Sequence, residues 1–269
     1  MQRLKPKKRL GQHYLIDGNI ARKIVRALDV HSEDVILEIG PGQGALTRFL
    51  RDRAKQLILV EVDARVVPLL RSEYQEETTR VVQQDFLEFD LRKAAQECGQ
   101  KFRVVGNLPY NITSPILFKV IDTCDAVRDA VVMVQLEVAE RIVARPRTKD
   151  YGILSVLCQF YSKPTLLFEV SPNAFYPRPK VHSALLRLDF SRRPFYALKN
   201  EHLFRQVVRS TFGKRRKILL NSLKCIKLPL TNGEFWKRIE FDLSRRPEDL
   251  TVEEFVKLTN RIAELLEHG

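Results

Sequence analysis

Short apolar runs alternate with segments of helical periodicity over the first 190 residues of the chain. Each run is rich in β-branched residues, and each of the first four is followed by glycine or a polar residue, which is typical of buried strands. Five such runs cover 34–39, 57–60, 80–84, 102–106 and 130–135. Strands that alternate with helices predict a parallel sheet with helices on both faces.

The last two apolar runs of this region are connected differently. They cover 165–170 and 181–190, and the proline-rich loop 175–179 joins them, which predicts a hairpin. The hairpin is expected to close the sheet with one antiparallel strand. The pattern therefore predicts an α/β fold with a doubly wound, mostly parallel sheet of seven strands.

The periodicity becomes purely helical beyond residue 190. Apolar positions recur at helical spacing in the segments 202–212, 216–224, 233–238 and 252–267. We therefore expect a catalytic α/β domain over 1–190, preceded within it by a basic arm over 1–18, and a small all-helical domain over 191–269.

The positive charge is concentrated in two segments. Residues 1–26 hold eight Lys or Arg against Asp17 alone, and residues 191–227 hold eleven against Glu201 alone, whereas the whole chain carries a net charge of +13. Such runs are often solvated surface, but two of them beside one candidate site favour a groove for a nucleic-acid backbone. The expected phosphate contacts are Lys7, Lys8, Arg9, Lys214, Arg215, Arg216 and Lys217.

Polar residues follow the first four strands. The first strand runs into a glycine-rich loop that contains Gly40 and Gly42, the second ends at Glu61, and the third at Asp85. Glycines let a ligand approach the backbone, and a carboxylate at the end of the second strand suits the hydroxyls of a ribose. The loop alone fits a dinucleotide or S-adenosylmethionine equally well; Asp85, placed to accept from an adenine amino group, favours the latter.

The fourth strand delivers Asn107-Leu108-Pro109-Tyr110. The Asn107 side-chain oxygen and the Leu108 carbonyl could each accept one N–H of an exocyclic amine, which would free the nitrogen lone pair for methylation. Tyr110 would stack on the ring of the base. An ordinary strand-to-helix turn, with Asn and Pro as turn formers, is the alternative interpretation of these four residues.

Several ordered motifs together resemble one family, the ribosomal RNA adenine dimethyltransferases of the small subunit (the kasugamycin-sensitivity type). They are Gly11-Gln12-His13-Tyr14-Leu15, Val60-Glu61-Val62-Asp63, Gln83-Gln84-Asp85, Asn107-Leu108-Pro109-Tyr110, Phe175-Tyr176-Pro177-Arg178-Pro179-Lys180-Val181-His182-Ser183 and the basic segment 215–223. The resemblance extends from about residue 8 to about residue 260.

This resemblance implies a Rossmann-like methyltransferase that uses S-adenosylmethionine. It implies cofactor contacts from His13, Leu15, Gly40, Gly42, Glu61, Asp85 and Asn107, catalytic roles for Asn107, Leu108 and Tyr110, and a target base held between Tyr110 and Phe175. The implied substrate is a pair of adjacent adenosines in the loop of the 3'-terminal hairpin of small-subunit rRNA, each dimethylated within a pre-30S particle. His13 departs from the usual Asn of the family, although an imidazole can still donate to the cofactor's carboxylate.

Other classes of function fit the sequence less well. The four cysteines have no C-x-x-C spacing, so we expect reduced thiols and no metal, and no apolar run is long enough for a bilayer, so we expect a cytoplasmic monomer without membrane contact. Three alternatives remain open. They are an adenine methyltransferase of large-subunit rRNA of the resistance type, a non-catalytic assembly factor with the same fold, and a dinucleotide oxidoreductase.

Overall fold

The structure is a computed structural model that describes residues 4–214, 217–226 and 233–267. Its contacts divide the chain into two compact units. The first consists of residues 1–139 and 163–192, and the second of residues 140–162 and 193–269.

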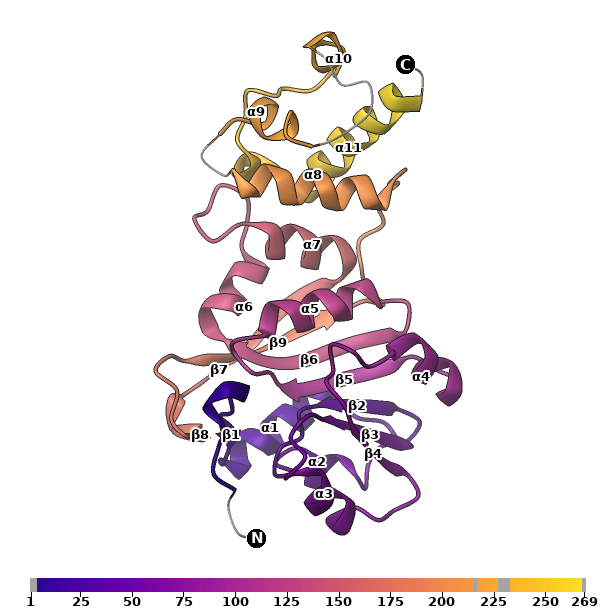
Figure 1. The fold of residues 1–269 in the computed structure, drawn as a ribbon, viewed down its shortest axis with the longest axis vertical. Coiled ribbons are helices and arrows are strands. Elements are labelled where there is room, and N and C mark those ends of the chain that lie inside the picture. The colour runs from indigo at the N-terminus through magenta and orange to yellow at the C-terminus, as the bar shows by residue number, and fades with distance from the viewer. Residues whose placement is uncertain (1–3, 215–216, 227–232, 268–269) are drawn as a thin grey trace. The chain divides into compact units, whose positions relative to one another are not determined.

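A mixed β-sheet forms the centre of the first unit (Figure 1). Among the described residues it has seven strands in the order β4-β3-β2-β5-β6-β9-β7. Neighbours from β4 to β6 are parallel, and β9 runs antiparallel to both β6 and β7. The strands are β2 (Val35–Ile39), β3 (Gln56–Glu61), β4 (Thr79–Gln83), β5 (Phe102–Asn107), β6 (Val127–Gln135), β7 (Lys163–Val170) and β9 (Ser183–Asp189). The predicted doubly wound sheet with one antiparallel strand is confirmed.

Helices of the first unit cover the sheet, and local signals set their ends. They are α1 (Gly18–Leu28), α2 (Thr47–Leu50), α3 (Val67–Glu73), α4 (Leu91–Cys98), α5 (Thr113–Asp122) and the start of α6 (Leu136–Val143). Asp17 caps α1 by accepting from the N–H groups of Asn19 and Ile20, and Gly99 ends α4 in the left-handed region. Buried side chains of α1, α2 and α3 share one core with β2, β3, β5 and β6. Because α5 packs on β6 without joining this core, it covers the other face.

A second, two-stranded ladder lies beside the sheet. It pairs β1 (Tyr14–Leu15) with β8 (Phe175–Tyr176), which are far apart in the sequence but side by side in Figure 1. In the sequence, β1 comes after the short helix η1 (Lys8–Leu10), and β8 comes directly after the short helix η2 (Pro172–Ala174). It therefore ties the N-terminal arm to the hairpin that closes the sheet.

The second unit is helical, as predicted, but it includes more of the chain than expected. Its helices are α7 (Ile153–Tyr161), α8 (Glu201–Gly213), α9 (Leu219–Leu223), α10 (Gly233–Lys237), η3 (Pro247–Asp249) and α11 (Val252–Glu267). The segment 140–162 belongs here because α7 packs against α8 and α11. The sequence placed that segment in the first domain, whereas the predicted boundary at residue 190 lies close to the observed division at Arg192.

A buried ion cluster joins the amino ends of three strands in the first unit. The Arg103 guanidinium, on β5, donates to Asp129 on β6 at 2.8 Å and to Asp34, just before β2, at 2.8 Å. It also donates to the backbone carbonyls of Leu28 and Asp29 at the end of α1. All three charged side chains are almost completely buried. The cluster therefore holds α1 to the sheet at the edge opposite the strand ends that carry the predicted site.

Arg103→Met should destabilise the first unit, because it leaves two buried carboxylates without their cation. We expect the free energy of unfolding to fall by about 3–5 kcal/mol. Urea denaturation followed by circular dichroism measures this change. The matched control is Arg128→Gln, since Arg128 also contacts Asp34 but its side chain is 53% exposed; it should cost less than about 1 kcal/mol. Equal, small effects of both substitutions would contradict the proposed structural role of Arg103.

Candidate active site

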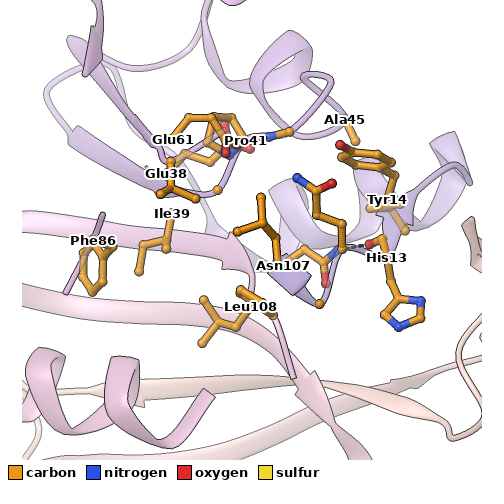
Figure 2. A pocket seen from close by; sticks show the side chains of 18 of the residues that line it. His13, Tyr14, Glu38, Ile39, Pro41, Ala45, Glu61, Phe86, Asn107 and Leu108 are labelled. Carbon is orange, nitrogen blue, oxygen red and sulfur yellow. Dashed lines mark hydrogen bonds between the residues drawn. The ribbon is translucent and has the colours of Figure 1, made fainter. Parts of the chain in front are cut away.

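A cavity of about 260 Å³ opens where the carboxyl ends of β2, β3, β4 and β5 meet. It lies entirely within the first unit. Figure 2 shows Glu61, Pro41 and Glu38 at one end, Asn107 in the middle, and Tyr14 and His13 on the side of the N-terminal arm. The structure thus brings together residues that the sequence placed at four separate strand ends.

The glycine loop leaves its backbone open to the cavity. Gly40 has φ +62°, and no atom lies within 4 Å of where a side chain would begin. Gly42 has φ +54°, and a side chain there would begin 3.0 Å from the Tyr14 ring. Glycine therefore serves two purposes in this loop, since it permits the left-handed turn and makes room for the ring that packs on it.

Glu61 is buried at the end of β3, as predicted. Its Oε2 accepts from the Gly42 N–H at 3.0 Å and its Oε1 accepts from the Asp63 N–H at 2.8 Å. Burial raises the pKa of Glu61, although these backbone hydrogen bonds oppose the shift. Each carboxylate oxygen retains further acceptor capacity. The side chain can therefore still accept the hydroxyls of a ribose.

Asp85 lies two residues beyond β4 and lines the cavity. Its Oδ1 accepts from the Leu87 N–H at 2.8 Å, which fixes the carboxylate. Its Oδ2 accepts no hydrogen bond from any residue that the structure describes. Phe86 and Ile39 supply apolar surface nearby (Figure 2). This end of the cavity suits a flat heterocycle that carries an amino group.

Asn107 is held by the N-terminal arm. Its Nδ2 donates to the His13 carbonyl at 2.7 Å, drawn as the dashed line in Figure 2. Because the amide nitrogen is engaged there, the side-chain oxygen is the group left to accept from a ligand. The next residue, Leu108, is buried on the cavity wall and donates its N–H to Met133 on β6 at 3.0 Å. These contacts fix the segment that carries both predicted acceptors.

Tyr110 and His13 form a stacked pair. Their ring centroids are 5.4 Å apart at an interplanar angle of 26°. The Tyr110 hydroxyl is hydrogen-bonded to Ser183 at 2.6 Å, and burial raises its pKa. His13 Nδ1 donates to the Pro177 carbonyl at 2.7 Å. Since Nδ1 donates to that carbonyl, a neutral His13 ring has no second N–H, and only the doubly protonated imidazolium could donate to a cofactor carboxylate through Nε2.

Phe175 does not reach the cavity. It is 3% exposed and belongs to the core under α1, α2 and α3, whereas its neighbour Tyr176 is 49% exposed and lines the cavity. Side chains alternate between the two faces of a strand, so one of two consecutive residues is buried and the other is not. The structure thus gives no support to the expected stacking role of Phe175. Leu15, the other residue of the pair that faces the core, is largely buried but still borders the cavity.

Asp63 has no predicted role, yet this carboxylate anchors the arm. Asp63 is buried and accepts from Lys7 Nζ at 3.0 Å, Gln12 Nε2 at 3.2 Å and Arg65 Nη2 at 2.6 Å. The Arg65 hydrogen bond is the main reason that the Asp63 pKa is well below its usual range. The one feature of the sequence that points to Asp63 is its position two residues after Glu61.

The residues predicted to contact RNA phosphates differ in how free their side chains are. Lys7 is engaged by Asp63, whereas Arg9, Lys214 and Lys217 have exposed side chains. Arg215 and Arg216 lie outside the described residues, as does the side chain of Lys8. Among the residues that the structure does describe, no His, Cys, Asp and Glu side chains gather as a metal site would require.

Comparison with known proteins identifies the family. A sequence model of "Ribosomal RNA adenine dimethylase" matches residues 3–264. The chain belongs to this family. A relative from Francisella tularensis subsp. novicida (strain U112), named "Ribosomal RNA small subunit methyltransferase A", is 43% identical over 95% of this chain and 97% of its own length. One of the same name from Caldanaerobacter subterraneus subsp. tengcongensis is 42% identical over 96% and 98%.

Solved structures show the same fold. A dimethyladenosine transferase from Plasmodium falciparum has a TM-score of 0.78 at 26% identity, covering 94% of this chain and 98% of that one. The 23S rRNA methyltransferase ErmE has a TM-score of 0.68 at 27% identity, covering 93% and 99%. The protein is therefore a methyltransferase with the Rossmann-like fold that its sequence predicted, and that fold implies S-adenosylmethionine as the cofactor. No helix among the residues described here is long and apolar enough to cross a membrane.

The residues around the cavity fit this cofactor. Glu61 is a buried acceptor, Gly40 exposes backbone to open space, and Asp85 keeps one oxygen available. Glu61→Gln should weaken S-adenosylmethionine binding by about 1–3 kcal/mol, since an amide offers one acceptor oxygen where the carboxylate offers two. Isothermal titration calorimetry measures the affinity. Glu33→Gln, at an exposed site away from the cavity, is the control; an unchanged affinity for the Glu61 variant would remove Glu61 from the cofactor site.

The buried carboxyl of Glu38 should make the stability of the protein depend on pH. The side chain is buried, it accepts from the Thr47 hydroxyl at 2.7 Å, and burial raises its pKa from 4.5 to about 8. Between these two values the folded protein holds a proton that the unfolded chain has lost. The free energy of unfolding of the cofactor-free protein should therefore fall as pH rises, by up to about 1.4 kcal/mol per pH unit from this group.

Glu38→Gln keeps an acceptor for Thr47 but cannot ionise. We expect the variant to gain stability relative to the wild type as pH rises from 5 to about 8. Urea denaturation at pH 5, 6.5 and 8 gives the three differences. A difference that stays constant across the series would show that Glu38 ionises freely in the folded protein.

Proposed function

We propose that this protein uses S-adenosylmethionine to dimethylate N6 of two adjacent adenosines in the loop of the 3'-terminal hairpin of small-subunit rRNA. The reaction would take place in the cytoplasm, on a pre-30S particle, with the enzyme acting as a monomer. The observation that carries the proposal is the orientation of Asn107, whose amide nitrogen is bound by the His13 carbonyl so that its oxygen remains for an amine donor.

The cofactor would lie along the four strand ends. Glu61 would accept from its ribose, Asp85 from its adenine amino group, and the loop around Gly40 and Gly42 would pass close to its methionine portion. S-adenosylmethionine supplies a methyl group already activated on a sulfonium. The protein then has to position the target and prepare its nitrogen.

The amine would be prepared by two acceptors. The Asn107 Oδ1 and the Leu108 carbonyl each take one N–H, which directs the nitrogen lone pair toward the methyl group. A monomethylated amine still has one N–H for one of these acceptors, so the same site can act twice. The released proton passes to water, and Tyr110 provides a face against which the extruded base can stack.

The relatives favour the small subunit as the target. Two relatives over 40% identical to this chain carry the name of a small-subunit enzyme, whereas ErmE, named for 23S rRNA, is 27% identical. A purely non-catalytic assembly role would leave the shared cavity without a purpose. The cavity is lined by the proposed catalytic residues together with the proposed cofactor ligands, namely Asn107, Leu108, Tyr110, Glu61 and Asp85. The match to a family of rRNA adenine dimethylases argues against a dinucleotide oxidoreductase.

The substrate RNA would contact the exposed basic side chains. Arg9, Lys214 and Lys217 are exposed and support this assignment, and we retain Lys8, Arg215 and Arg216 on the strength of the sequence alone. Lys7 fits less well, because its ammonium is bound by buried Asp63 and would have to leave it to reach a phosphate. Lys214 donates to Cys225 Sγ at 2.8 Å, a contact that a phosphate could replace.

One experiment tests both the proposed substrate and the role of Asn107. Small subunits from a strain that lacks this gene are incubated with S-adenosylmethionine and the purified protein, and primer extension reads the modified bases. The wild type should block extension at two adjacent adenosines near the 3' end. Asn107→Ala should lower the rate by at least about 100-fold, the scale for removing one preorganised polar group, while particle binding changes little.

Asn111→Ala is the matched control. Asn111 is an exposed asparagine four residues further along that does not line the cavity, so its loss should leave the rate nearly unchanged. Modification of large-subunit RNA instead would favour the resistance-type alternative. Near wild-type methylation by Asn107→Ala would remove Asn107 from the chemistry without touching the substrate assignment.

A further inference from the structure

The 85–89 turn, which follows β4, carries the end of the cavity that suits a flat heterocycle. The Asp85 carbonyl accepts from the Phe89 N–H at 3.1 Å, and the Asp85 carboxylate accepts from the Leu87 N–H. Asp85 and Phe86 both line the cavity. These hydrogen bonds lie within the turn itself. They fix its shape, whereas its position depends on contacts with other elements.

Lys119, a half-buried residue of α5, contacts this turn. Its Nζ donates to the Leu87 carbonyl at 2.6 Å and lies 5.8 Å from the centroid of the Phe86 ring. Leu87 therefore has two partners, since its N–H binds the Asp85 carboxylate and its carbonyl binds the Lys119 ammonium. A displacement of the Leu87 backbone would move the carboxylate that the N–H holds.

The contact of Lys119 with the turn is a directed hydrogen bond within an acidic surrounding. Burial lowers the pKa of its ammonium, whereas the nearby carboxylates of Asp90, Asp85 and Glu88 oppose the shift. Among the residues that the structure describes, its hydrogen-bond partner is a neutral carbonyl and none of these three carboxylates. A hydrogen bond depends on both distance and angle, so it defines the position of the turn more sharply than charge attraction alone.

We propose that Lys119 is a positioning residue for cofactor recognition. It holds the 85–89 turn so that the Asp85 carboxylate is directed at the adenine amino group of S-adenosylmethionine and Phe86 lies along the adenine ring. Lys119 does not line the cavity, so it acts through the turn and touches no atom of the cofactor. This inference rests on the proposed function, because it takes the adenine of that cofactor as the ligand of Asp85.

The test measures how well the site distinguishes an amino group from a carbonyl. S-adenosylhomocysteine and its 6-oxo analogue, S-inosylhomocysteine, are each titrated into the protein by calorimetry. The wild type should bind the adenine ligand about 5- to 150-fold more tightly, because the 6-oxo group leaves the Asp85 acceptor unpaired. Lys119→Met removes the ammonium but keeps most of the aliphatic chain, and it should reduce this affinity ratio by at least about three-fold.

Two further variants separate positioning from stability. Lys119→Arg keeps a charged donor and should restore most of the affinity ratio. Lys93→Met, at an exposed lysine of α4, should behave as the wild type. If Lys119 only stabilised the fold, Lys119→Met would lower the melting temperature and weaken both ligands by the same factor, and the ratio would not change.

A double-mutant cycle shows whether Lys119 acts through Asp85. In the background of Asp85→Ala, Lys119→Met should change the affinity ratio by less than about two-fold, because the acceptor that it positions is gone. With S-adenosylmethionine and unmodified small subunits, Lys119→Met should raise KM for the cofactor while kcat at saturation stays within about three-fold of the wild type.

The outcomes separate this inference from the proposed function. If the wild type discriminates between the two ligands but Lys119→Met keeps the full ratio, the inference is overturned and the function stands. An equal loss in Lys93→Met, or a loss that persists in the background of Asp85→Ala, would also overturn it. A wild type that binds both ligands equally would remove Asp85 from adenine recognition, and the inference with it. If the ratios are as expected but the wild type fails to methylate small subunits, the role of Lys119 is supported and the proposed substrate is wrong.

Discussion

The hydrogen bond from Asn107 to the His13 carbonyl joins two parts of the molecule that must meet for a site to exist. One part is the sheet, which brings the ends of β2, β3, β4 and β5 to a single edge and presents Asn107 there. The other is the N-terminal arm, which forms the opposite wall of the cavity. The bond also fixes the amide orientation, so the same contact that closes the cavity decides which atom of Asn107 faces a ligand.

Two further sets of contacts hold the arm against the strand ends. Beside the glycine loop, the Asp63 carboxylate accepts hydrogen bonds from Lys7 and Gln12. Beside Tyr110, the Pro177 carbonyl accepts a hydrogen bond from His13. The ion cluster around Arg103 acts at the far edge of the sheet, where it holds the end of α1. Buried polar groups with complete sets of partners thus lie at both edges, and the apolar core between them keeps the strands in register.

Much of the fold and the centre of the site could be predicted because they depend on local signals. A buried parallel strand is an apolar run, and the residue after it lies at the functional edge, so Glu61, Asp85 and Asn107 could be placed from the sequence. The helix α11 begins and ends where its periodicity predicted.

What could not be predicted depends on pairing between distant residues. A two-residue strand such as β8 has too few positions to show which of them faces the core, and only its pairing with β1 decides between Phe175 and Tyr176. The hydrogen bond between Lys7 and Asp63 could not be predicted either, because the two residues are 56 positions apart in the sequence. The grouping of segment 140–162 with the second unit could not be predicted for a similar reason, since α7 packs against α8 and α11.

The ladder between β1 and β8 also constrains the order in which the molecule can be assembled. His13 and Pro177 are 164 residues apart, so the arm leaves the ribosome long before its partner strand has been synthesised. Domains generally fold as units during synthesis, and closing so long a loop has an entropic cost that grows only slowly with its length. The glycine loop and the first strands can therefore pair early, while the wall that completes the cavity has to wait for the hairpin. A nascent chain that stops before residue 175 would have most of the sheet but no closed site.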